Sequence, residues 1–193
     1  MLIGLVSDIH GNTAALSHAL DLLQEAQMLV CLGDSINQHR FSNETVRLLR
    51  ERTVLTIWGN HEAAFFSGVA SGRSLPPWVD RDLSSWLEQC PLTIEQDMGG
   101  RRVLIVHSTA LDPLGDYVAG EGPKFQSHFG GTRADIILCG HTHLPGVRRT
   151  SDGTVVINPG SVGEGRPSET GFIASCALLE TAGADVRFFE FMH

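Results

Sequence analysis

The sequence has no long apolar run, and this absence argues against a membrane-spanning helix. No stretch of its 193 residues approaches the roughly 18 uncharged apolar residues that a span requires. The opening segment MLIGLVSDIHG has no positive flank and places an acid at position 8, which argues against a secretory signal. We therefore expect a soluble, cytoplasmic protein without a membrane partner.

Closely spaced cysteines are also missing. The four cysteines, Cys31, Cys90, Cys139 and Cys176, are far apart, form no C-x-x-C motif and mostly lie inside apolar runs. This spacing is typical of reduced thiols in a core. It disfavours both a cysteine-based zinc site and a disulfide framework.

Clusters of positive charge are absent, and the formal net charge is −8. Arg101-Arg102 and Arg148-Arg149 are only pairs. Because a negative field repels polyanions, we expect no nucleic-acid footprint, although a bound metal could still hold a phosphate. Apolar residues make up 42% and charged residues 19%, close to globular averages, so with this length we expect one domain over residues 1–193.

Short apolar runs of strand type recur along the chain, with no repeat or polar linker between them. The runs are LIGLV (2–6), MLVCL (28–32), TVLTI (53–57), RVLIV (102–106), DIILC (135–139), TVVI (154–157), FIASCALL (172–179) and VRFFEF (186–191). The early runs alternate with helical patterns at 13–26, 43–51, 61–69 and 80–89. The later runs meet at glycine-containing turns at 98–100, 151–153 and 182–184.

This order of elements predicts the fold class. An alternating first half and a hairpin-rich second half favour an α/β fold with two mixed sheets packed face to face and helices outside, a four-layer α-β-β-α sandwich. Residues 109–126 show no usable period, and we expect there either a loop over the site or an irregular connection.

Five of the apolar runs end in polar residues of the kinds that bind metals, and five of the nine histidines stand at these ends. The residues are Asp8, His10, Asp34, Asn60, His61, His107, His141 and His143. In an open α/β sheet the loops at the carboxyl ends of strands converge on a site. We therefore expect these side chains to lie together.

Each of these residues has a simple structural explanation when taken alone. An aspartate after a strand commonly caps the next helix, Asn60 after Gly59 suits a tight turn, and His107 suits a buried core histidine. The pair His141 and His143 is stronger evidence, because alternate residues of an extended segment point the same way. Caps and turns do not select imidazoles at three strand ends and carboxylates at two others, so the set as a whole predicts a metal site.

The ligand types restrict the metal without choosing it. Oxygen and imidazole ligands without thiolate suit Mn²⁺, Fe²⁺ or Fe³⁺, Zn²⁺ and Co²⁺. Seven candidate ligands are too many for one ion and fit two if one carboxylate bridges them. We expect a dinuclear centre of two divalent or trivalent ions, with Mn serving in vitro and Fe, Zn, Co or Ni as alternatives.

With these residues in view, the sequence resembles the calcineurin-like metallophosphoesterases. SDIHGN (7–12) is similar to their D-x-H block, LGD (32–34) to G-D, GNHE (59–62) to G-N-H-[DE], VH (106–107) to the single-histidine block and GHTH (140–143) to G-H-x-H. NPGSVG (158–163) is similar to a loop that follows the last histidine block in small bacterial members. Five blocks in the family's order make a specific signal.

The resemblance implies a role for each residue. The ligands of the first metal would be Asp8, His10, Asp34 and His143. The ligands of the second would be Asp34, Asn60, His107 and His141, with Asp34 as the bridge. His61 would contact the phosphate and help protonate the leaving oxygen, while a hydroxide shared by the two cations attacks phosphorus in line.

One block departs from a known subfamily. Phosphoprotein phosphatases continue G-D as G-D-x-x-D-R-G, but here Asn37 replaces the later acid and Gln38 the arginine, and the loop does not match the G-Y-G-P continuation of small bacterial members either. The departure argues against phosphoprotein substrates and leaves open what orients His61. Arg40 and Arg166 are candidates for the missing positive charge, and a solvated surface arginine is the simpler interpretation of each.

We therefore expect a phosphoester hydrolase acting on small phosphodiesters. Phosphomonoesters, phosphoproteins and dinucleoside polyphosphates are alternative substrates. A non-catalytic protein-binding scaffold is the alternative from another class, and it is disfavoured because such a protein would be expected to have lost ligands or His61. Without a basic groove, the expected partner is a small phosphate ester and not a polymer; the oligomeric state stays open.

Overall fold

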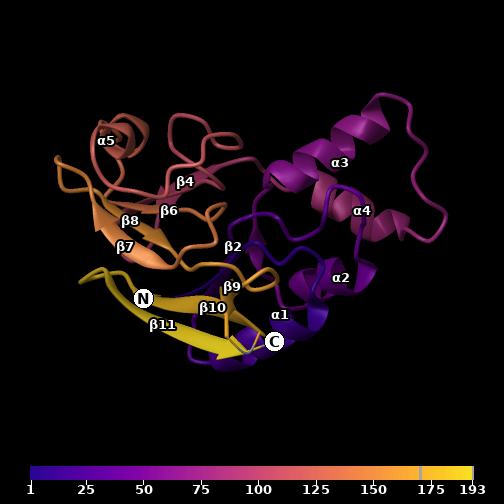
Figure 1. The fold of residues 1–193 in the computed structure, drawn as a ribbon, viewed down its shortest axis with the longest axis horizontal. Helices are drawn as coiled ribbons and strands as arrows, with labels where there is room; N and C mark the ends of the chain where they lie inside the picture. Colours follow the sequence, from indigo (N-terminus) through magenta and orange to yellow (C-terminus); the bar gives the residue numbers. More distant parts are fainter. Residues whose placement is uncertain (170, 193) are drawn as a thin grey trace.

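The computed structural model describes residues 1–169 and 171–192, whose strands form two mixed sheets (Figure 1). The first sheet has the order β11-β10-β1-β2-β3, with β9 paired to β10, and the second has the order β4-β5-β6-β8-β7. The strands of the first sheet are β1 (Leu2–Val6), β2 (Met28–Cys31), β3 (Leu55–Thr56), β9 (Arg166–Ser168), β10 (Gly171–Glu180) and β11 (Asp185–Met192). Those of the second are β4 (Ile94–Asp97), β5 (Arg102–Ile105), β6 (Ile136–Leu138), β7 (Gly146–Arg149) and β8 (Val155–Asn158).

Each sheet has a parallel centre. Strands β1, β2 and β3 run parallel in the first sheet, and β5, β6 and β8 run parallel in the second. The other pairings are antiparallel, and the expected turns at 98–100, 151–153 and 182–184 connect β4 to β5, β7 to β8 and β10 to β11. The parallel strands matter for function because their carboxyl ends carry the candidate site.

The helices are α1 (Thr13–Leu22), α2 (Asn43–Glu51), α3 (Asn60–Ala70), α4 (Arg81–Glu88) and α5 (Pro123–Phe129). Helices α3 and α5 follow glycines, and the other three follow a side chain that accepts a backbone hydrogen bond. Asn12 caps α1, Ser42 caps α2 and Asp80 caps α4, each accepting from an amide of the first turn. Helix α1 ends at Leu22, earlier than the expected residue 26, because the chain turns there to enter β2.

Three apolar clusters define the layers. The central cluster lies between the sheets and includes Ile3, Leu5, Ile105 and Ile157. A second cluster packs the outer face of the first sheet against α1, and a third packs the outer face of the second sheet against α5 (Figure 1). The expected α-β-β-α sandwich is confirmed. No helix among the described residues is long and apolar enough to cross a membrane.

The elements that the sequence did not predict are short or lie at sheet edges. Strands β4 and β7 alternate half-buried and exposed residues, and β9 has three residues, so none forms an apolar run. Helix α5 has seven residues, and most of it falls within the segment 109–126, where no period was found. Its buried side chains, Phe125 and Phe129, pack against the second sheet. This tertiary contact stabilises a helix that is too short to give a recognisable pattern in the sequence.

Candidate metal centre

The polar residues at the strand ends meet where the carboxyl ends of both sheets converge. Loops after β1 and β2 and the start of α3 contribute from the first sheet, and loops after β5 and β6 contribute from the second. Imidazole and carboxylate atoms form three overlapping groups, each with its atoms within 4.8 Å of one another. The groups are Asp8, His10 and His143; Asp34, His107 and His141; and His10, Asp34 and His61.

All eight residues that the sequence singled out lie in this cluster. Asn60 belongs to none of the three groups, but its Oδ1 lies 3.0 Å from His107 Nε2. Asp34 belongs to two of the groups, and its Oδ2 lies 3.3 Å from His107 Nε2. At the other end of the cluster, His143 Nε2 lies 3.3 Å from Asp8 Oδ1 and 3.4 Å from His10 Nε2.

The backbone is strained at five of these positions. The φ angles are 52° at Asp8, 49° at His10, 52° at Asp34, 64° at His141 and 58° at His143. Residues with side chains adopt this left-handed region at a cost of about 1–3 kcal/mol each. The strained backbone is thus concentrated at residues whose side chains point toward the cluster.

Glycines let the ligand-bearing loops approach each other closely. A Cβ at Gly59 would overlap the Asp34 carboxylate. A Cβ at Gly33, whose φ is +96°, would lie 2.6 Å from Gly59 N and 2.8 Å from His107 Nδ1. Larger residues at these two positions would push the loop bearing Asp34 away from its neighbours.

Glu62 fastens the loop after β2 to the start of α3. Its buried carboxylate accepts hydrogen bonds from the amides of Asp34 (2.9 Å), Ser35 (2.8 Å), Ile36 (3.1 Å) and Gly59 (2.8 Å), and from the Ser35 hydroxyl. Burial raises the pKa of Glu62, and the charge of Asp34 adds to this, whereas the donors favour the carboxylate form. The sequence signal for this role is the glutamate at the third position of α3, which supplies the half of a capping box that accepts from the amide preceding the helix.

The loop NPGSVG braces both histidine-bearing segments. Asn158 Nδ2 donates to Gly140 O at 2.6 Å, next to His141. Ser161 Oγ donates to Asp8 O at 2.8 Å, and Gly163 N donates to the same oxygen at 3.0 Å. These bonds hold the loops after β1 and β6 in register.

Two residues approach the cluster in ways that the sequence did not reveal. The hydroxyl of Tyr117 donates to Thr142 O at 3.0 Å, and its ring centroid lies 5.8 Å from that of His141. The amide of Gln38 donates to His61 Nδ1 at 3.0 Å. A backbone amide leaves no sequence signal, whereas Tyr117 is the sole tyrosine of the chain and lies in the segment without a period.

The charges of the cluster compensate one another. Burial acts against the charge of Asp8, but His143 and His107 outweigh it and lower the pKa of Asp8 to about 2. Burial also acts against protonation of His107, but Asp34 outweighs it and raises the pKa of His107 to about 9. Burial lowers the pKa of His10 and of His141, which favours their neutral, ligand form.

The donor set fits cations. Asp8 Oδ1 and His10 Nδ1 are buried and have no hydrogen bond of sound geometry within the described part of the chain, and the His143 ring lies 3.3 Å from Asp8 Oδ1. Buried carboxylates surrounded by imidazole nitrogens are costly unless they are paired or hold a metal. The set contains no sulfur, which suits hard or borderline metals.

An apolar cavity of about 580 Å³ adjoins the cluster at His143. Its walls include Leu144, Pro167 and Phe172, whose side chain is half exposed. Arg166 also lines it, but its guanidinium is paired with Glu190 on β11. Neither this paired arginine nor Arg40, which is exposed on the loop after β2, makes an ion pair with the cluster in the described part of the chain.

Comparison with known proteins decides the family. A family model described as the calcineurin-like phosphoesterase superfamily domain matches residues 1–184. The chain belongs to this superfamily. The resemblance inferred from the five sequence blocks is therefore confirmed, and this phosphoesterase is a metal-dependent hydrolase of phosphoric esters.

Related proteins agree with the fold. A metallophosphoesterase from Sphaerobacter thermophilus superposes with a TM-score of 0.79 at 22% identity, covering 100% of this chain and 88% of that one. The phosphoesterase Yfce from E. coli superposes with a TM-score of 0.59 at 20% identity, covering 100% of this chain and 99% of that one. The uncharacterised protein MJ0912 of Methanocaldococcus jannaschii is 28% identical over 196 aligned positions, covering 86% of this chain and 77% of that protein.

Proposed function

We propose that this phosphoesterase hydrolyses small phosphodiesters with two metal ions held by the cluster. The observation that carries the proposal is the overlap of the three groups: Asp34 belongs to the group of His107 and His141 and also to that of His10 and His61, and His10 belongs in turn to the group of Asp8 and His143. One ion would be held by Asp8, His10, Asp34 and His143. The other would be held by Asp34, Asn60, His107 and His141. Two such ions supply neutralisation of phosphate charge and an activated water at neutral pH.

The single-domain organisation is part of this proposal. The core between the sheets draws on residues from Ile3 to Leu179, so both ends of the matched region contribute to one apolar cluster. The ligands come from both sheets. We therefore treat residues 1–193 as one calcineurin-like domain.

His61 would deliver the proton to the leaving oxygen. A backbone amide can only donate, so Nδ1 of His61 accepts from Gln38 and the ring proton of the neutral form sits on Nε2. Nε2 lies 3.8 Å from Asp34 Oδ2, on the side of the ring that faces the cluster. The Gln38 amide orients the neutral ring so that Nε2 faces the cluster. To act as the acid, the ring would first take up a proton on Nδ1, which breaks the bond from Gln38, and would then pass the Nε2 proton to the leaving oxygen.

Proton release should accompany metal uptake, because His107 is protonated in the metal-free protein below about pH 9 and must be neutral to bind a cation. We expect calorimetry of the chelator-stripped protein, in buffers of different ionisation enthalpy, to detect about one more proton released per site at pH 7 than at pH 9.5. A His107→Gln variant should lose the difference. Equal proton release by the natural chain at both pH values would contradict the assignment.

The same histidine links stability to pH. Its pKa is raised from the ordinary value of 6.5 to about 9, so its contribution is fully present below pH 6.5 and is lost as the pH rises through about 9. We expect the free energy of unfolding of the metal-free protein to fall across this window. The fall should be smaller in the His107→Gln variant, as measured by urea unfolding at each pH.

The apolar cavity beside His143 would receive an ester group of the substrate. We expect Phe172→Ala to raise KM for an aryl diester about 10-fold, because a half-exposed phenyl ring offers part of the roughly 1.5–3 kcal/mol that full burial of such a side chain yields. KM for a dimethyl diester should stay unchanged. Trp78→Ala, which removes another exposed aromatic ring, is the matched control. An equal rise for both esters would exclude the cavity as an ester site.

The test of the function is hydrolysis of a chromogenic phosphodiester beside the matching monoester. Chelator-stripped protein with Mn²⁺ restored should cleave the diester faster, and a chelator should abolish turnover. Faster cleavage of the monoester, or of a dinucleoside polyphosphate in a third assay, would replace the diester proposal. Absence of turnover with all three, across several metals and with folded protein, would contradict it.

A further inference from the structure

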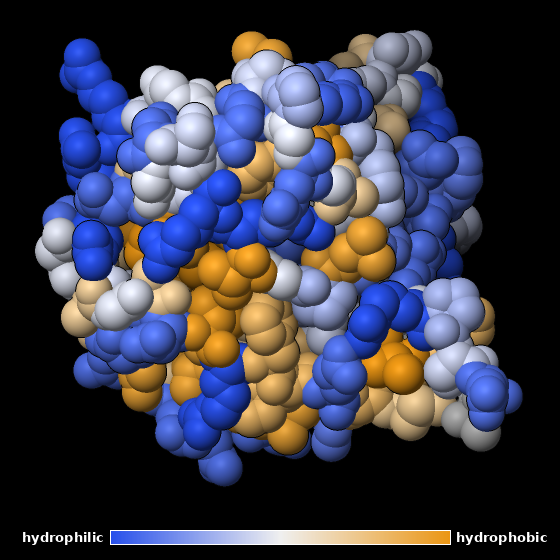
Figure 2. Space-filling model, turned by 60° about the vertical axis from the view of Figure 1, so that its left-hand side comes forward, coloured by the Kyte–Doolittle hydropathy of each residue, from blue (hydrophilic) through white to orange (hydrophobic). Residues whose placement is uncertain are grey.

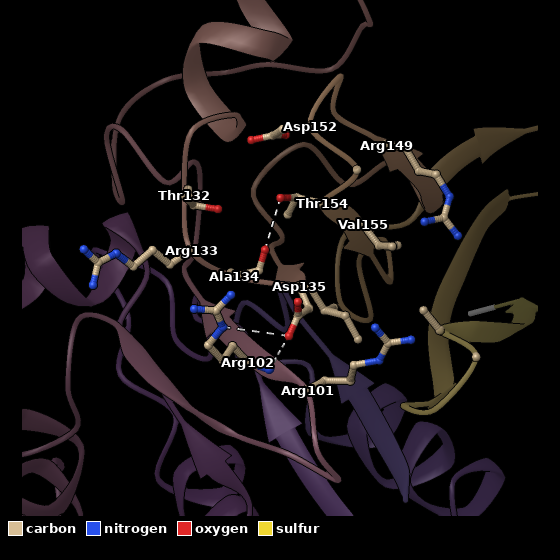
Figure 3. Close-up of a pocket in the computed structure, with 14 residues that line it drawn as sticks. Arg101, Arg102, Thr132, Arg133, Ala134, Asp135, Arg149, Asp152, Thr154 and Val155 are labelled. Carbon is tan, nitrogen blue, oxygen red and sulfur yellow. Dashed lines mark hydrogen bonds and ion pairs between the residues drawn. The ribbon is translucent and has the colours of Figure 1, made fainter.

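A second cavity, which is polar, lies at the end of the second sheet opposite the metal cluster. It has a volume of about 350 Å³ and surrounds the starts of β5, β6 and β8 (Figure 3). The cluster follows the carboxyl ends of two of these strands, β5 and β6. Figure 2 turns this end of the molecule forward and shows hydrophilic side chains among apolar ones. The cavity and the metal cluster share no lining residue.

Arginines from separate parts of the sequence line this cavity. They are Arg101, Arg102, Arg133 and Arg149. The chain as a whole carries 14 basic against 22 acidic residues, and its sequence contains only isolated arginine pairs. Folding brings one pair together with members of two other segments, against only two aspartates among the lining residues.

The two aspartates are already engaged. Asp135 Oδ2 accepts a hydrogen bond from the Arg102 amide at 2.8 Å and lies 4.0 Å from Arg102 Nε (Figure 3). Asp152 accepts from the Gly131 amide at 2.8 Å and from the Thr150 hydroxyl. Among the described residues that line the cavity, therefore, only Arg102 has a carboxylate partner.

Two guanidinium groups are left facing the same side of the cavity. Within the described ranges, neither Arg101 nor Arg149 lies within ion-pair distance of a carboxylate; Arg101 Nη2 donates to Ala182 O at 2.7 Å. Figure 3 shows the two side chains rising from different segments toward each other, whereas Arg133 points away. Two like charges at the rim of one hollow repel each other unless an anion lies between them.

The cavity also offers an unused hydroxyl. Thr132 Oγ1 is buried without a hydrogen-bond partner among the described residues, and in Figure 3 it points into the hollow. A buried hydroxyl is normally satisfied, so an unpaired one in a cavity indicates a missing acceptor or donor. An oxyanion would supply the acceptor.

We propose that this cavity binds a small ligand bearing two or more phosphate groups, held between Arg101 and Arg149. The planar guanidinium fork matches phosphate oxygens in pairs. The lining charge favours a ligand with more than one negative charge, and the volume is of the order of known small-ligand sites. This binding is independent of the metal cluster and of the proposed reaction.

The test is titration of inorganic pyrophosphate into the chelator-stripped full chain at low salt, followed by calorimetry. Removal of the metals keeps the cluster from competing for phosphate. We expect saturable binding of one equivalent. Arg149→Ala and Arg101→Ala should each weaken it about 10-fold, as expected for loss of a charge-assisted contact. Arg148→Ala, which removes the neighbouring arginine of β7 outside the cavity, is the matched control and should leave Kd unchanged.

Each other outcome overturns the proposal. Equal weakening by Arg148→Ala and Arg149→Ala would show diffuse surface attraction. Citrate binding as tightly as pyrophosphate would show a general polyanion site without preference for phosphate. No heat and no protection against thermal unfolding at millimolar pyrophosphate would show that the cavity binds no such ligand. Melting curves of all three variants show whether they are folded.

Discussion

His61→Ala is expected to lower kcat by about 10²–10⁴-fold while both metal ions stay bound, because general acid catalysis is worth this much. The assignment depends on geometry. Nδ1 of His61 accepts from the Gln38 amide, so Nε2 alone is available toward the cluster, where Asp34 Oδ2 lies 3.8 Å away. Although the ring belongs to one of the three candidate ligand groups, we propose that it moves a proton and does not hold an ion.

The measurement pairs kinetics with metal content. The loss in kcat should shrink for esters whose alcohol is already a good leaving group, because such an alkoxide needs no proton. A merely structural role for His61 would lower the rate for all esters equally. His18→Ala, which changes a histidine on α1 whose ring makes an edge contact with Phe191, is the control. If His61→Ala loses one ion by elemental analysis, His61 is a ligand and the proposed role is wrong.

Asp34→Asn is expected to have a larger effect than His61→Ala, because Asp34 belongs to two of the three ligand groups and would bridge the two ions. Asparagine preserves the shape but removes the charge and replaces one oxygen with a donor. Loss of a group that merely orients a ligand weakens metal binding about 10–100-fold, so loss of a bridging carboxylate should exceed about 100-fold and affect both ions. Turnover should fall with occupancy.

Two other substitutions separate a bridge from an ordinary ligand. Asp8→Asn should release one ion and retain the other, whereas Asp34→Asn should weaken both. Asp135→Asn, which alters a carboxylate at the opposite end of the second sheet, should leave the metal content unchanged. Elemental analysis after dialysis against defined free Mn²⁺ gives the stoichiometry. Two ions bound to Asp34→Asn with unchanged affinity would exclude the bridge.

Much of the fold could be predicted from the sequence because the central strands are buried on both faces. Strands β1 and β6 are apolar throughout, β8 is apolar up to Asn158, and the burial of all three is nearly complete. Edge strands such as β4 and β7 bury only alternate residues, and helix α5 forms against the sheet from two phenylalanines. Helices and strands that are stabilised by packing on only one face leave a weak hydrophobic pattern in the sequence.

The candidate site divides in the same way. Its eight side chains are residue types that capping and turns do not select at so many strand ends, so the sequence alone singled them out, and the structure places them together. Their roles as ligands and proton donor stay predictions. The groups that hold them left little signal, because the Gln38 amide is backbone and Glu62 acts through amides of a distant loop.

The sequence by itself determined the fold class, the family and the residues gathered at the strand ends, because each is written in local runs and short motifs. Only the tertiary structure decided what orients His61, which cavity adjoins His143, and that Arg101 and Arg149 share one hollow. Gln38 and His61 are 23 residues apart in the sequence, and Arg101 and Arg149 are 48 residues apart. The partners in these contacts are backbone atoms or isolated side chains. Periodicity and motif spacing carry no information about such contacts, because the contacts form only when the chain folds.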